Sequence, residues 1–286
     1  PTPNRDICLL GGFKKPEEPV VKEAKQEELV NYRVENQIAV ISLNRPRRLN
    51  AFSDEMVSAL SKTLYKFDID DDANVAVLHG NGRAFSSGAD VHQRQQRTRE
   101  EFLKLGGPEG RGAKFEDLFI KSVNWKPIIT APHGYVLGGA FGIILESDLI
   151  VAEEGTQVQL TETGRGLSGS KFWALMNFRG GNTLATEIAL TGRFFNAEEM
   201  HAAGIVDRIA PKGKYLDNAI ELAHQVNANP PLSVRATVRT RRLKMQQVGH
   251  EAQASVDPMR LYLTEDFQEA ASAFTEKRKP NPYKGK

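Results

Sequence analysis

The residues with the most specific chemistry lie in a glycine-containing stretch, HGYVLGGAFG at 133–142, which follows a short apolar run and leads into a predicted helix. Because glycine lacks a Cβ, a turn at Gly138 and Gly139 can bring bare backbone N–H groups close to a ligand. The first N–H groups of a helix have no partner within it and attract negative charge. The stretch therefore favours stabilisation of an oxyanion, with a plain tight turn before a buried helix as the alternative.

This stretch is one of four that together resemble the crotonase superfamily, also called the enoyl-CoA hydratase/isomerase family. Each motif alone is weak evidence, but all four occur in the family's order and at its spacing, so the chain is identified as a member. The resemblance extends from about Tyr32 to FTEKR at 274–278. The four motifs are NRPRRLNAF at 44–52, FSSGAD at 85–90, HGYVLGGAFG at 133–142 and TETGRGL at 161–167.

The resemblance implies chemistry on an acyl-CoA thioester, in which two backbone N–H groups stabilise an enolate or a related oxyanion. By motif position, these donors are the N–H groups of Ala89 and Gly139. Glu162 matches the family's second catalytic glutamate and is the expected general acid/base. The alternative for Glu162 is a surface or capping glutamate.

The sequence departs from the hydratases at their first catalytic glutamate, where it has Gly142, which cannot transfer a proton. Glu146 lies four residues later on the same helical face and is a possible second acid. A structural ion pair or hydrogen bond is the favoured interpretation of Glu146, because buried acids are normally paired.

We therefore expect an enzyme of the isomerase or lyase class, and favour an isomerase in which Glu162 alone moves the proton. The alternatives on the same scaffold are enoyl-CoA hydration, thioester hydrolysis or carbon–carbon cleavage. A non-catalytic acyl-CoA-binding protein is a further alternative. The acyl group itself is not determined by the sequence.

The resemblance also indicates residues that contact coenzyme A. Arg47 and Arg48 follow the NRP motif, and Asp90 and Val91 border the expected adenine pocket. Phe274 and Lys277 match a position from which a neighbouring subunit often reaches the nucleotide. A solvated surface role is the alternative for the charged side chains. The complete set of expected coenzyme A contacts is Arg47, Arg48, Ser87, Asp90, Val91, Phe274 and Lys277.

Other polar residues give less specific signals. His133 stands where the family usually has asparagine, and we expect it to stabilise a turn. Ser86 and Ser87 have no His/Asp partner at informative spacing, so a nucleophilic triad is unsupported. A basic run near the C-terminus is expected to be a solvated helix face, a phosphate site or an assembly contact; it comprises Arg235, Arg239, Arg241, Arg242 and Lys244.

Composition narrows the class of protein. A net charge of +2 over 286 residues gives no general case for binding nucleic acid or an acidic membrane. No run reaches the roughly 20 apolar residues that a membrane-spanning helix needs. Cys8 is the only cysteine, which excludes an intrachain disulfide and fits a cytoplasmic setting. We expect no metal and no cofactor beyond the coenzyme A moiety of the substrate.

The apolar runs predict alternating strands and helices, and the resemblance implies an α/β fold, a crotonase-like ββα spiral core with a helical C-terminal trimerisation region. The expected divisions are an N-terminal arm at 1–28, a core at 29–226 and a helical assembly region at 227–286. A homotrimer, or a hexamer built as a dimer of trimers, is the expected assembly. Expected core strands are Gln37–Leu43, Val75–His79, Ile128–Ala131, Leu149–Ala152 and Ile205–Ile209, with a helix at Phe115–Val123 and a mobile tail at 277–286.

Overall fold

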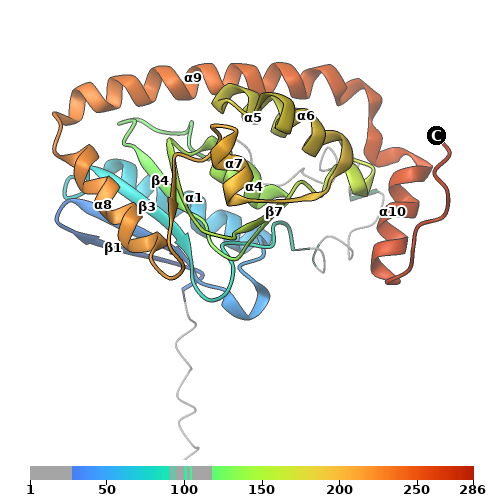
Figure 1. Ribbon diagram of the computed structural model, residues 1–286, viewed down its shortest axis with the longest axis horizontal. Helices are drawn as coiled ribbons and strands as arrows, with labels where there is room; N and C mark the ends of the chain where they lie inside the picture. The colour runs from blue at the N-terminus through green and yellow to red at the C-terminus, as the bar shows by residue number, and fades with distance from the viewer. Residues whose placement is uncertain (1–27, 91–92, 94–99, 102–103, 105–117) are drawn as a thin grey trace, which may run out of the picture.

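The computed structural model describes residues 28–90, 93, 100, 101, 104 and 118–286 (Figure 1). Its larger sheet has the strand order β1-β2-β3-β4-β6-β9, with β1 antiparallel to β2 and the other pairs parallel. A smaller sheet has the order β5-β7-β8. The strands of the larger sheet are β1 Val30–Glu35, β2 Ile38–Leu43, β3 Val75–Gly80, β4 Ile128–Ala131, β6 Leu149–Glu153 and β9 Arg208–Ala210.

The central strands β2, β3 and β4 are buried along their whole length. Their sequences are continuous apolar runs because a parallel sheet is covered on both faces, so neither face alternates with polar residues. Helix α1 (Asp54–Ile69) packs its Met56, Leu60 and Phe67 side chains into the core at helical spacing. Ser53 caps the N-terminus of α1, since its side chain accepts a hydrogen bond from the Met56 N–H.

The smaller sheet carries the glycine turn. Strand β5 (Tyr135–Leu137) pairs with β7 (Gln157–Gln159), which pairs with β8 (Phe194–Asn196). Helix α4 (Gly139–Glu146) begins directly after β5, and Gly138 between them has φ +50°. The glycine turn and the helix predicted from this stretch are therefore confirmed, whereas the short strand β5 was not predicted.

The second half of the chain is mainly helical. Helix α9 (Pro231–Val256) lies along one side of the molecule in Figure 1, next to α5, and α10 (Glu265–Thr275) lies beyond its far end. None of the helices that the structure describes has the length and apolar composition that a bilayer-spanning helix requires. The remaining helices are α5 Ser170–Arg179, α6 Asn182–Thr191, α7 Ala197–Ala202 and α8 Tyr215–Asn227, with short 3-10 turns that include η1 Pro46–Arg48 and η2 Thr163–Arg165.

Three expectations need correction. Within the expected helix at Phe115–Val123, residues 118–123 form turns and bends, and 115–117 lie outside the described residues. In the predicted strand Ile205–Ile209, only 208 and 209 are in β9, because the N–H groups of Ile205 and Val206 donate back to the Met200 carbonyl of α7. The tail at 277–286 is ordered, since the N–H groups of Lys284 and Gly285 donate to Asp266.

The expected N-terminal arm at 1–28 lies almost wholly outside the described residues. The division of the rest of the chain into a core and an assembly region stays a prediction.

The basic run on α9 is only partly solvated. Arg242 is 1% exposed and forms a buried ion pair with Asp148, to which Arg241 also contributes at 3.4 Å. The Arg242 guanidinium donates to the carbonyl oxygens of Phe119 and Lys126 at 3.0 and 2.9 Å. The prediction of a solvated helix face is therefore wrong for Arg242. Its side chain joins α9 to the loops around β4.

We predict that Arg242→Met destabilises the fold by about 3 kcal/mol, because it leaves the Asp148 carboxylate buried without its main partner. Urea unfolding followed by circular dichroism measures this change in the free energy of unfolding. Arg239→Met, on the exposed part of the same helix, is the control and should change stability by less than about 0.5 kcal/mol. Equal effects of the two substitutions would contradict the assignment of a core role to Arg242.

Candidate active site

Two backbone segments meet at the glycine turn. The loop at 86–90 pairs with β5, since the Ser86 N–H donates to the Tyr135 carbonyl at 3.2 Å and the Leu137 N–H donates to the Ser86 carbonyl at 3.1 Å. A Cβ built on Gly88 would lie 2.3 Å from the Leu137 carbonyl oxygen and 3.4 Å from the Gly139 nitrogen. Only glycine permits this approach, which brings the loop against the first residue of α4.

The predicted oxyanion donors are placed by this contact. Ala89 follows Gly88 in the loop, and Gly139 is the first residue of α4; both are partly exposed. Neither N–H donates to an acceptor among the residues that the structure describes, whereas the neighbouring Gly138 and Asp90 N–H groups donate at 2.9 and 3.1 Å. Two adjacent unpaired donors, one of them at a helix N-terminus, suit a developing negative charge.

The Glu162 carboxylate lies beside the same turn. A Cβ built on Gly138 would be 3.3 Å from Oε1 and 3.8 Å from Oε2 of Glu162, and 2.6 Å from the Thr161 hydroxyl. This position results from the pairing of β5 with β7, because Glu162 follows β7 by three residues, and from the Gly138 N–H bond to Gln159. The structure thus brings Glu162, Gly139 and the 86–90 loop together, as the motifs predict.

An aromatic ring lies against Gly142, the position of the missing hydratase glutamate. A Cβ built on Gly142 would be 3.3 Å from Cε1 of Phe172, which comes from α5. The Phe172 ring also stacks on Phe141, with centroids 6.1 Å apart. The described side chain that lies against Gly142 is therefore apolar, and the carboxylate found beside Gly138 is that of Glu162.

Glu146 is engaged deeper in the protein. Its Oε1 lies 2.9 Å from Nζ of Lys171, and both side chains are mostly buried. This is the structural ion pair that we favour for Glu146 from the sequence. A role as second acid stays a prediction, and it would have to compete with Lys171.

His133 stabilises a turn, as expected. Its Nε2 lies 2.9 Å from the Gly82 carbonyl oxygen, and its ring stacks on Tyr215 with centroids 4.3 Å apart. Burial lowers the pKa of His133, which favours the neutral ring. These contacts hold the chain between β4 and β5, which precedes the turn at Gly138.

The expected coenzyme A contacts occupy two regions. Arg47 and Arg48 are exposed on η1, and Ser87 binds this segment through its N–H bond to the Leu49 carbonyl at 2.9 Å. Asp90 forms an ion pair with Arg45 at 2.5 Å, a partner that the sequence did not suggest. Val91 lies outside the described residues.

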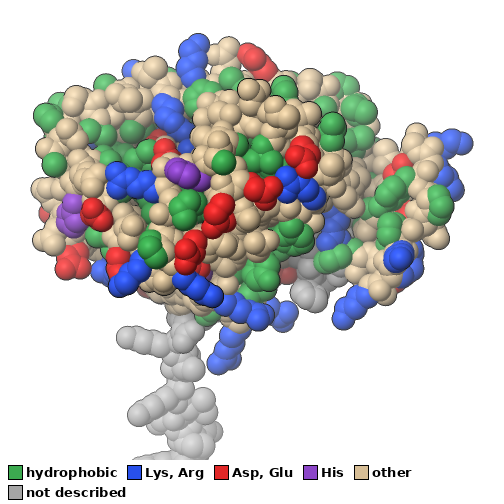
Figure 2. Space-filling view, in the orientation of Figure 1, with side chains coloured by type: hydrophobic (Ala, Val, Ile, Leu, Met, Phe, Trp, Pro, Cys, Tyr) green, Lys and Arg blue, Asp and Glu red, His purple; other side chains and the backbone are tan. Residues whose placement is uncertain are grey.

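Phe274 and Lys277 lie at the C-terminal end of α10, away from the first group in sequence. Phe274 is partly exposed, and its ring contacts Arg165, whose Cζ is 3.3 Å from the ring centroid. In Figure 2, the part of the molecule formed by α10 carries several Lys and Arg side chains on its outer surface. The nucleotide contacts of Phe274 and Lys277 stay predictions.

Two residues near the site were missed from the sequence. Buried Asn50 donates to the carbonyls of Asn81, Ala84 and Phe85 and so fixes the start of the 86–90 loop. Its place inside the NRPRRLNAF motif was the available signal. Phe172 gave no signal, because Gly142, which it contacts, comes from a distant part of the chain.

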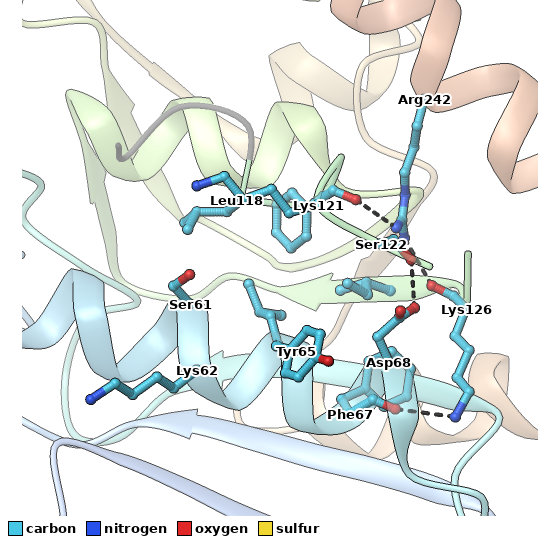
Figure 3. Close-up of a pocket in the computed structure, with 13 residues that line it drawn as sticks. Ser61, Lys62, Tyr65, Phe67, Asp68, Leu118, Lys121, Ser122, Lys126 and Arg242 are labelled. Carbon is cyan, nitrogen blue, oxygen red and sulfur yellow. Dashed lines mark hydrogen bonds between the residues drawn. The ribbon is translucent and has the colours of Figure 1, made fainter. Parts of the chain in front are cut away.

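A separate cavity of about 270 Å³ lies between α1 and the segment before β4 (Figure 3). Its polar wall is largely engaged: Asp68 accepts hydrogen bonds from Ser122 and from the Val123 N–H, and the Lys126 ammonium group donates to the Phe67 carbonyl. None of the predicted catalytic residues lines it. Within the described parts of the chain, no group of three or more His, Cys, Asp and Glu side chains is arranged to hold a metal ion.

Comparison with known proteins agrees with this geometry. The model of the enoyl-CoA hydratase/isomerase family matches residues 33–286. The chain belongs to this family. Enoyl-CoA hydratase EchA19 of Mycobacterium tuberculosis is 31% identical to the chain over 255 residues, which cover 85% of this chain and 91% of that protein. Mevalonyl-coenzyme A hydratase sidH of Aspergillus fumigatus is 31% identical over 256 residues, covering 85% and 90%.

Solved structures confirm the crotonase fold. The structure of a methylmalonyl-CoA decarboxylase in complex with 2-nitronate-propionyl-CoA superposes with a TM-score of 0.74 at 26% identity, covering 89% of this chain and 98% of that one. The protein is therefore a crotonase-family acyl-CoA enzyme, and the fold class predicted from its four motifs is confirmed.

We predict that Gly88→Val lowers kcat/KM on an acyl-CoA substrate by at least about 100-fold, because the new side chain pushes the two donor segments apart. Gly155→Ala is the matched control: Gly155 also has positive φ, but a Cβ there meets nothing within 4 Å. Steady-state kinetics with circular dichroism spectra of both variants test the prediction. Similar losses of kcat/KM in both variants would show that backbone strain, and not separation of the two donor segments, lowers the activity.

Proposed function

We propose that the enzyme is an enoyl-CoA isomerase that shifts a carbon–carbon double bond by single-carboxylate proton transfer. The observation that carries the proposal is that the Glu162 carboxylate lies at the turn at Gly138, whereas an apolar ring, Phe172, lies against Gly142, where the hydratases have their other glutamate. Moving a double bond requires one group that removes and returns a proton. Adding water across it normally requires a second group to hold the water.

In the proposed reaction, the thioester oxygen accepts hydrogen bonds from the Ala89 and Gly139 N–H groups. The Glu162 carboxylate removes a proton from the α carbon of a 3-enoyl-CoA, and the electron pair enters a dienolate whose negative charge rests on that oxygen. Protonated Glu162 then returns the proton to the γ carbon, which leaves the double bond between the α and β carbons. Each donor would contribute roughly 3 kcal/mol of transition-state stabilisation.

Hydration is the second candidate, because similar proteins are named hydratases, among them EchA19 and sidH. Under this alternative, Glu162 activates the water and Glu146 assists after releasing Lys171. Thioester hydrolysis and carbon–carbon cleavage would use the same oxyanion site, and the decarboxylase similarity illustrates that range. A non-catalytic acyl-CoA-binding protein would leave Glu162 without a proton to move.

We also propose that the chain's own carboxylate and backbone N–H groups suffice, so that no cofactor is needed beyond the coenzyme A moiety of the substrate. A homotrimer or a dimer of trimers is the proposed assembly. The exposed apolar side chains of Tyr135 and Phe194 on the smaller sheet, and of Leu232 on α9, support it. A cytoplasmic setting stays a prediction.

We predict that Glu162→Gln lowers kcat for enoyl-CoA isomerisation by about 100-fold or more, because the amide cannot take up the proton. Glu251→Gln, an exposed glutamate on α9, is the matched control and should retain full activity. Assays of 3-enoyl-CoA substrates in H₂¹⁸O identify the reaction, since isomerisation incorporates no solvent oxygen. Undiminished turnover by Glu162→Gln would refute the proposal, and ¹⁸O in the product would favour hydration or hydrolysis.

We predict that the double substitution Gly142→Glu with Phe172→Ala creates or raises hydratase activity toward 2-enoyl-CoA, because it supplies a second carboxylate and the space to hold it. Phe172→Ala alone opens the space next to Gly142 but supplies no second carboxylate, so it should not raise hydratase activity. Gly142→Glu alone should show little hydratase activity, because the new side chain would collide with the Phe172 ring. Hydration measured by loss of enoyl absorbance distinguishes the three variants, and equal rates in all of them would contradict the account of Phe172.

A further inference from the structure

The cavity between α1 and the segment before β4 has an apolar floor (Figure 3). Its volume of about 270 Å³ is near the lower end of the range for small-molecule sites. At about 30 Å³ for each water-sized group, it has room for roughly nine such groups. The apolar side chains that line it are all buried, and they are Leu64 and Phe67 on α1, Leu118 and Phe119 before β4, and Ile128 at the start of β4.

A buried positive charge lines the same cavity. The Lys126 side chain is 3% exposed, and its ammonium group donates to the carbonyl oxygens of Phe67 and Asp70 at 3.1 and 2.5 Å. Among the described residues, no carboxylate lies within ion-pair distance of it. Asp68, the one acidic side chain in the described lining, is already occupied by hydrogen bonds from the segment before β4. The lining is therefore positive on balance and attracts an anion.

The lining also contains polar groups that have no partner within the described chain. Lys62 and Lys121 are exposed, and neither forms an ion pair with a described residue. The Ser61 and Tyr65 hydroxyls likewise make no hydrogen bond to any residue in the described ranges. In Figure 3, Ser61 and Lys62 lie at the end of the cavity opposite Asp68. Two ammonium groups and two hydroxyl groups are thus available to a ligand in this cavity.

We propose that this cavity binds a small amphipathic carboxylate, the anion of a medium-chain fatty acid. The apolar floor takes the hydrocarbon chain, and the Lys62 and Lys121 ammonium groups donate to the carboxylate at the exposed edge. A neutral apolar molecule would gain nothing from these cations, and inorganic phosphate would leave the apolar floor in water. None of the residues at the glycine turn lines the cavity, so this second site does not depend on the proposed reaction.

Isothermal titration calorimetry of the full chain with octanoate tests the site. We expect saturable binding of one octanoate per chain with a dissociation constant of about 1 mM or lower, an affinity in the range expected for a ligand of this size. Acetate has the charge without the chain, and 1-octanol has the chain without the charge, so each should bind at least about tenfold more weakly. Absence of saturable octanoate binding would overturn the proposed site.

Two matched double variants locate the carboxylate. Lys62→Gln with Lys121→Gln should raise the dissociation constant for octanoate by about tenfold or more, because both ammonium groups at the cavity are lost. Lys66→Gln with Lys212→Gln removes the same charge from exposed positions that do not line the cavity, and should change this constant by less than about threefold. Equal weakening in the two variants would indicate general charge attraction and would overturn the role assigned to Lys62 and Lys121.

A competition experiment separates this cavity from the active site. Octanoate titrated into protein saturated with hexanoyl-CoA should bind with unchanged affinity, because the cavity shares no lining residue with the glycine turn. Loss of octanoate binding in the presence of the thioester would place the carboxylate in the acyl site and overturn the second site. Glu162→Gln should bind octanoate as the wild-type protein does, whatever its turnover, so failure of the isomerase proposal and failure of this one are distinguishable.

Discussion

The close approach of two backbones at Gly88 and Gly139 is the contact on which the rest of the site depends. A single Cβ at Gly88 would overlap the Leu137 carbonyl, so no other residue type allows the loop to lie there. The contact brings together two segments about 50 residues apart in sequence, and these carry the two N–H groups that we propose as oxyanion donors. Hydrogen-bond donors fixed in advance stabilise developing charge without the cost of reorienting as the reaction proceeds.

The fold supplies this contact through rigid elements. The central strands β2 and β3 of the larger sheet are buried along their whole length, and Asn50 links the end of β3 to the loop through three backbone carbonyls. The smaller sheet aligns β5 with β7, which places Glu162 beside the turn at Gly138. Catalytic groups that are held by packed strands and helix ends keep their geometry better than groups on free loops.

Gly142 and Phe172 show how one scaffold can carry different reactions. The proposed oxyanion donors are backbone N–H groups, which do not depend on the side chains around them. In this chain Gly142 stands where the hydratases have a glutamate, and the Phe172 ring lies against it. Family membership therefore identifies the oxyanion chemistry, whereas the reaction depends on which acids surround it.

The sequence by itself determined the fold family, and it predicted the two oxyanion segments and Glu162, because glycines at fixed spacing and an acid in a motif are local features. It also indicated that Gly142 stands where the hydratases have their first catalytic glutamate. Only the tertiary structure decided that Phe172 closes the space at Gly142, that Lys171 pairs with Glu146, and that Arg242 is buried against Asp148. Each of these contacts joins residues 25 or more positions apart, and neither periodicity nor composition encodes which distant side chains will meet when the chain packs.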